Sequence, residues 1–89
     1  MKKIELTNGL KLEIDEENLQ DMELLDDLYE SQTTNPLKVS AVIQKVLGDE
    51  NKKKLYDYIR DKKTGRVLPD DVTDALMEIF SKMDETKNS

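Results

Sequence analysis

One apolar run, residues 36–48, constrains the fold of this sequence most, because 38% of the residues in the whole chain are charged. Apolar residues in the run recur at i, i+3, i+4, i+7 and i+8, which places them on one face of a helix. They are Val39, Val42, Ile43, Val46 and Leu47. Asn35 suits the N-cap, Pro36 the first helical position, and Gly48 the left-handed residue after the last turn. The run therefore predicts a central helix over residues 36–47.

The 89 residues allow one small core, and no cysteine is present to cross-link it. A β-hairpin is predicted over residues 3–14, where apolar and polar residues alternate on both sides of a turn. A two-residue turn would scatter the apolar side chains over both faces. A three-residue loop, residues 7–9, instead pairs Ile4 with Leu12 and gives Gly9 the positive φ. We therefore expect the three-residue loop, with the apolar face of the hairpin packed on helices.

A second helix is predicted over residues 18–31, with Asn18 as its N-cap and acidic residues in its first turn. The residues expected on its inward face are Met22, Leu25 and Tyr29, with Leu28 alongside. Leu24 lies off this face, so we expect it to be exposed.

Two more helices are predicted, over residues 50–63 and 69–83. The last one follows the helical template throughout, at Val72, Ala75, Leu76, Ile79, Phe80 and Met83. Residues 84–89 are polar, and we expect a flexible tail there. The predicted fold is α+β: a single domain over residues 1–83, in which an N-terminal β-hairpin packs on a small bundle of about four helices.

Charge is unevenly distributed along the chain, which has a net charge of −6. Residues 15–30 carry eight carboxylates and no base, whereas residues 52–66 carry seven bases against two acids. Solvated helix faces explain such clusters most simply, and electrostatic steering is the alternative. The net negative charge argues against nucleic acid as a partner.

The chain has no histidine and no cysteine, so the common general base, the thiolate nucleophile and the usual ligands of transition metals are missing. Residues 60–71 resemble a calcium-binding loop in spacing only, because Arg60 and Lys62 would occupy ligand positions. We therefore expect no enzyme activity, no cofactor and no metal site. No signal peptide or membrane-spanning run is evident, so we expect a cytoplasmic protein that does not bind membranes.

Five short motifs follow one another along the chain, and their order and spacing are more specific than any one of them. They are residues 21–28 (Asp-Met-Glu-Leu-Leu-Asp-Asp-Leu), 46–48 (Val-Leu-Gly), 65–67 (Gly-Arg-Val), 78–80 (Glu-Ile-Phe) and 87–89 (Lys-Asn-Ser). In succession they resemble the small tail assembly chaperones of long-tailed phages and prophages of Gram-positive bacteria. The resemblance covers nearly the whole chain from Ile4 onward. It departs at Met22, where such proteins often carry tryptophan.

The resemblance implies a non-catalytic morphogenesis factor in the cytoplasm of the host cell. Such a protein binds the tape measure protein, assists assembly of the tail tube protein around it, and is not expected in the mature virion. In many members a ribosomal frameshift near the end of the gene gives a minor, longer product. Thr86, Lys87 and Asn88 are compatible with a slippery A-AAA-AAC sequence.

Binding of an apolar helix requires exposed apolar side chains, and Leu24, Leu37 and Tyr58 lie off the main stripes of their predicted helices. They are the candidate partner-binding residues. One alternative is a small acidic regulator or DNA mimic that uses residues 15–30 to bind a basic protein. Another is a structural subunit that self-associates through its acidic and basic clusters.

Overall fold

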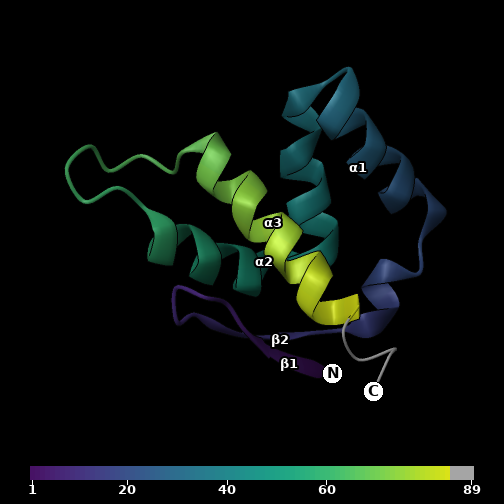
Figure 1. Ribbon diagram of the computed structural model, residues 1–89, viewed down its shortest axis with the longest axis horizontal. Coiled ribbons are helices and arrows are strands. Elements are labelled where there is room, and N and C mark those ends of the chain that lie inside the picture. Colours follow the sequence, from purple (N-terminus) through teal and green to yellow (C-terminus); the bar gives the residue numbers. More distant parts are fainter. Residues whose placement is uncertain (85–89) are drawn as a thin grey trace.

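The computed structural model describes residues 1–84, which form a β-hairpin and three α-helices (Figure 1). The elements in order are β1 (Lys2–Glu5), β2 (Lys11–Ile14), the 3-10 helix η1 (Glu16–Leu19), α1 (Met22–Thr33), the 3-10 helix η2 (Pro36–Lys38), α2 (Val39–Ile59) and α3 (Pro69–Asp84). This arrangement confirms the predicted α+β class. The flexible tail expected over residues 84–89 lies outside the described residues except for Asp84, which ends α3.

The hairpin has the predicted register, since Ile4 pairs with Leu12 in an antiparallel ladder. Leu6 donates its backbone N–H to the carbonyl of Leu10 over 2.8 Å, which closes a three-residue loop. Gly9 in this loop has a φ of 96°, a value that side chains disfavour. The alternating apolar side chains of both strands are therefore all buried on one face.

Polar contacts hold the hairpin against the helices, which lie along one side of it in Figure 1. The backbone N–H of Thr7 donates to a carboxylate oxygen of Glu78 in α3 over 2.6 Å. The side-chain amide of Asn51 in α2 donates to the carbonyl of Glu13 over 2.7 Å. Both ends of the hairpin are thus attached to different helices.

Helix α1 begins at Met22 rather than Asn18, because Asp21 takes the capping role and accepts the backbone N–H of Glu23 over 2.9 Å. Asn18 lies instead in η1, and its side-chain amide donates to the carbonyl of Val46 over 3.0 Å. In an uninterrupted helix that carbonyl would accept the N–H four residues later. Asn18 therefore joins η1 to α2 instead of capping α1.

The central helix is present, but it begins at Val39 rather than at residue 36, because Pro36–Lys38 form the 3-10 helix η2. Helix α2 extends to Ile59 and consists of two helical halves that meet at a kink at Gly48, where the sequence predicted a break. Gly48 has φ 76° and ψ 176°, so its φ is positive as expected while its ψ is extended rather than helical. The predicted helix over residues 50–63 is the second half of α2, and it ends four residues early. Arg60 leaves the helix with φ −59° and ψ 133°.

Helix α3 matches its prediction closely, and its inward residues complete the core. Val72, Ala75, Leu76, Ile79 and Met83 are buried, and Phe80 packs against them half-buried. Helix α3 contacts α2 and β1, whereas α2 contacts β2 and α1. The core therefore lies between the hairpin and the three helices, and α2 contributes to it on both sides of its kink.

Candidate partner-binding surface

The helix α1 is rotated about its axis relative to the sequence-based prediction. Leu24 is 0% exposed and Leu28 is half-buried, so these two leucines form the inward face. Met22, Leu25 and Tyr29, which were expected in the core, are exposed. The prediction that Leu24 lies exposed for a partner is therefore wrong.

Leu37 is the most exposed large apolar side chain, at 84%, and it lies at the edge of an apolar groove. The groove has a volume of about 400 Å³ and lies between the start of α2, the second half of α2 and the start of α3. Val39, Tyr56 and Val72 contribute to its walls. Asn35 holds Leu37 in place by accepting its backbone N–H over 3.3 Å.

Tyr58 is half-exposed but already has a structural partner. Its hydroxyl donates to the carbonyl of Asn8 in the hairpin loop over 2.7 Å. A Cβ atom at Gly9 would lie 3.0 Å from that hydroxyl, so ring and loop are closely packed. Tyr58 lines a different cavity from Leu37, and the structure does not bring the three candidate residues together.

A second apolar surface, which the sequence analysis missed, runs along the exposed side of α1. Met22, Leu25 and Tyr29 recur there at i, i+3 and i+7, which is one helical face. Gln32, on the same side of the helix, donates its amide to the sulfur of Met77 over 3.1 Å. Met77 belongs to α3, so α3 borders this surface. The periodicity revealed the stripe, but it could not show that the stripe faces solvent.

Within the acidic cluster over residues 15–30, Asp27 forms the closest ion pairs. The carboxylate of Asp27 accepts hydrogen bonds from the ammonium groups of Lys45 over 2.9 Å and Lys38 over 3.2 Å. The side chain of Asp27 is only 15% exposed. The two ammonium groups, that of Lys45 foremost, lower the pKa of the Asp27 carboxyl below its ordinary value. Asp27 in turn raises the pKa of both lysines. Lys38 also lies 3.5 Å from Glu30. These ion pairs join α1 to η2 and α2, whereas Asp26 has no basic partner within residues 1–84.

The basic cluster over residues 52–66 contributes in part to local structure. Arg60 donates to a carboxylate oxygen of Asp57 over 3.2 Å and to the carbonyl of Gly65 over 3.0 Å. The ammonium group of Lys52 lies 5.9 Å from the centre of the Tyr56 ring, within range of a cation–π interaction. The segment is thus a helix end followed by a structured turn.

No three side chains of the histidine, cysteine, aspartate or glutamate type gather into a possible metal site within residues 1–84. Over the same residues, no helix has the length and apolar character required to cross a membrane. No protein-family model, curated protein or solved structure matches the chain.

Proposed function

We propose that the protein is a non-catalytic tail assembly chaperone of a long-tailed phage or prophage of Gram-positive bacteria. It acts in the host cytoplasm, binds apolar helices of the tape measure protein and assists assembly of the tail tube protein around them. In this proposal the two halves of α2 are counted as separate helices, so the β-hairpin packs on a bundle of four helices: α1, the two halves of α2, and α3. The succession of short motifs described above is the source of the family assignment.

The observation that supports this function is that large apolar side chains remain exposed around a complete core. Leu37, Met22 and Tyr29 are all more than two-thirds exposed, at 84%, 68% and 69%. Scattered exposed apolar residues are normal, but these lie beside a groove or along one helix face. A net charge of −6 keeps such a surface soluble until an apolar helix binds to it.

The acidic regulator, or DNA mimic, is less well supported by the same surface. A mimic of DNA requires an array of unpaired carboxylates, because its partner binds phosphates through lysine and arginine. In α1 the carboxylates are interrupted by Met22, Leu25 and Tyr29. Asp27 is already neutralised by two lysines.

The function can be tested by co-expressing the chain with the tape measure protein encoded in the same genome. We expect the tape measure protein to be insoluble alone and to become soluble and co-purify with the chain, also in high salt. Apolar contacts resist salt, whereas contacts between exposed charges are screened. A tape measure protein that stays insoluble would refute the proposal. Competition with DNA for a basic protein would favour the acidic regulator instead.

A second experiment concerns the frameshift, whose expected position at Thr86 to Asn88 lies outside the described residues. The natural gene with its downstream DNA is expressed with an N-terminal tag, and the product is examined by blotting. A minor, longer band supports the family assignment, and a variant with synonymous codons at these positions should lose it.

A further inference from the structure

Four apolar side chains on α1 and α3 form a band that no other segment within residues 1–84 covers completely. It consists of Met22, Leu25 and Tyr29 of α1 and Met77 of α3, which are 68%, 45%, 69% and 37% exposed. The bond from Gln32 to the sulfur of Met77 connects the two helices at this surface. We call these four residues the α1–α3 band.

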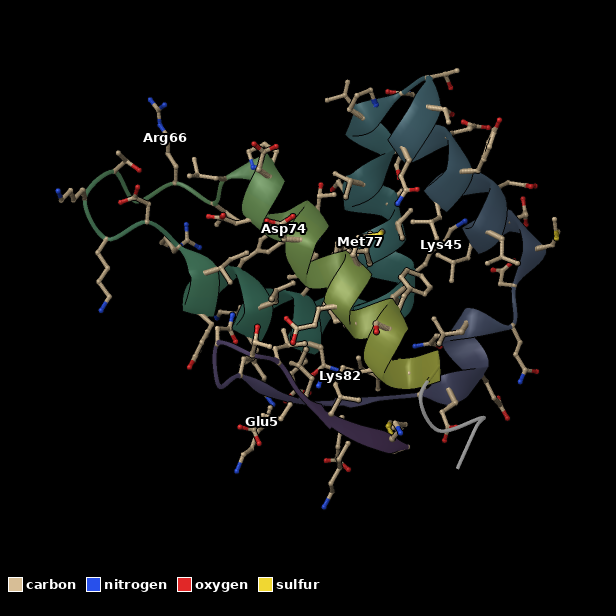
Figure 2. All side chains as sticks on the ribbon, viewed as in Figure 1. Glu5, Lys45, Arg66, Asp74, Met77 and Lys82 are labelled. Carbon is tan, nitrogen blue, oxygen red and sulfur yellow. The ribbon has the colours of Figure 1, made fainter. Side chains whose placement is uncertain are left out.

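Carboxylates border the band on both sides. On α1, Asp26 follows the stripe around the helix, away from α3. Glu30 lies beyond it and is paired with Lys38 over 3.5 Å. On α3, Asp70 and Asp74 share the exposed face of Met77, at positions seven and three residues before it. Figure 2 shows Asp74 and Met77 on neighbouring turns of α3, with Met77 on the side toward α1.

This distribution of charge indicates what can cover the band. Helix α1 itself contains no lysine or arginine. The lysines that pair with it, Lys38 and Lys45, are held by Asp27, and Lys38 also lies 3.5 Å from Glu30, so Asp26 is the carboxylate beside the stripe that has no basic partner within residues 1–84. A second copy docked through the same band would bring acidic edges against acidic edges, since a two-fold interface is self-complementary. Like charges across an interface are unfavourable. The occupant must therefore supply both apolar surface and positive charge.

We propose that the α1–α3 band binds a helix of a partner protein that carries one apolar stripe with lysines or arginines on both sides. The apolar stripe covers Leu25, Tyr29 and Met77, and the basic flanks reach Asp26 on one edge and Asp74 on the other. If the proposed function holds, the α1–α3 band is the surface that binds the tape measure protein, and the bound segment of that protein is a basic amphipathic helix. The inference rests on that function only for the identity of the partner.

The probes are two designed helical peptides of about 18 residues, a length that spans roughly five turns. They share one leucine stripe and differ only in flanks of lysine or of glutamate. Binding to the full chain is measured by fluorescence anisotropy. We expect the lysine peptide to bind at least about tenfold more tightly than the glutamate peptide, a difference of about 1.4 kcal/mol. This difference between the peptides should narrow as salt increases, because salt screens the charged flanks, while binding through the apolar stripe persists. Equal binding of the two peptides, or no binding of either, would overturn the proposal.

Variants then locate the contact. The triple variant Met22→Ser, Leu25→Ser, Tyr29→Ser removes exposed side chains only, so circular dichroism should show that it stays folded. Its affinity for the lysine peptide should fall at least about tenfold. The control variant Leu68→Ser changes an exposed apolar residue elsewhere and should bind like the parent chain. Unchanged binding by the folded triple variant would refute the assigned surface.

A charge-reversed variant gives an independent readout that does not remove apolar area. Asp26→Lys combined with Asp74→Lys should shift the preference of the chain toward the glutamate peptide.

The surface proposed here and the proposed function can be refuted independently of each other. If the triple variant solubilises the tape measure protein as well as the parent does, the band is wrong and the function stands. If the lysine peptide binds the band while the tape measure protein stays insoluble, the function is wrong and the band stands.

Discussion

Two adjacent leucines in α1 provide the sharpest test of how this helix is oriented. Leu24 is 0% exposed and belongs to the core, whereas Leu25 is 45% exposed on the α1–α3 band. Leu24→Ala should cost about 3 kcal/mol, from lost burial and the cavity that remains. Leu25→Ala should cost about 1 kcal/mol or less, because its side chain is half solvated and leaves no closed cavity. For a domain of this size, about 3 kcal/mol lowers Tm by roughly 12–24 °C.

The two variants are compared by urea unfolding and thermal unfolding, both followed by circular dichroism. Because the substitution is the same and the positions are neighbours, helix propensity and unfolded-state effects largely cancel between them. A Leu25→Ala variant that is destabilised as much as Leu24→Ala would refute the orientation of α1. It would also remove the basis for the α1–α3 band, which depends on Leu25 facing solvent.

Three further outcomes are expected. Gly48→Ala should lower the free energy of unfolding measured in urea by about 1–3 kcal/mol. A φ of 76° with a ψ of 176° is strained for any residue with a side chain, even though the space beside Gly48 is open. Tyr58→Phe should lower the free energy of unfolding by about 1 kcal/mol, since the hydrogen bond from the hydroxyl to the carbonyl of Asn8 is removed. The same variant should show faster amide hydrogen exchange in the hairpin loop. Asp27→Asn should be less stable than the parent at neutral pH, and the difference should shrink as pH falls below the ordinary carboxyl pKa of 3.8. The folded-state pKa of Asp27 is lowered, so its stabilisation is present above that value and is lost as the carboxylate becomes protonated. A difference that is unchanged at low pH would contradict this assignment.

Local signals predicted the hairpin and α3 well, because each contains one consistent pattern. Alternation and a loop glycine leave only one hairpin register that buries every apolar side chain, and Ile4 pairs with Leu12 as expected. In α3 a single stripe, from Val72 to Met83, follows the helical period throughout. Where only one face can be buried, periodicity is sufficient to identify it.

Competing local signals explain the errors at the boundaries. Asn18 and Asp21 are both good N-cap residues, and the sequence alone does not show that the amide of Asn18 is used by the carbonyl of Val46. The displaced start of α1 therefore depends on a contact between residues far apart in the sequence, which propensity cannot supply. Gly48, by contrast, interrupts the helix where the sequence indicated, with a φ of 76° and a ψ of 176°.

The error in α1 has a different cause and leads back to the surface proposed for binding. The helix carries two apolar stripes, one through Leu24 and Leu28 and one through Met22, Leu25 and Tyr29. Periodicity favours the longer stripe, whereas the shorter stripe packs in the core and Asp27 pairs with lysines from η2 and α2. Sequence rules in a consistent fold fail most often where residues serve a purpose other than folding. A stripe suited to the core but left outside it, with carboxylates along its edges, is a surface for a basic amphipathic helix.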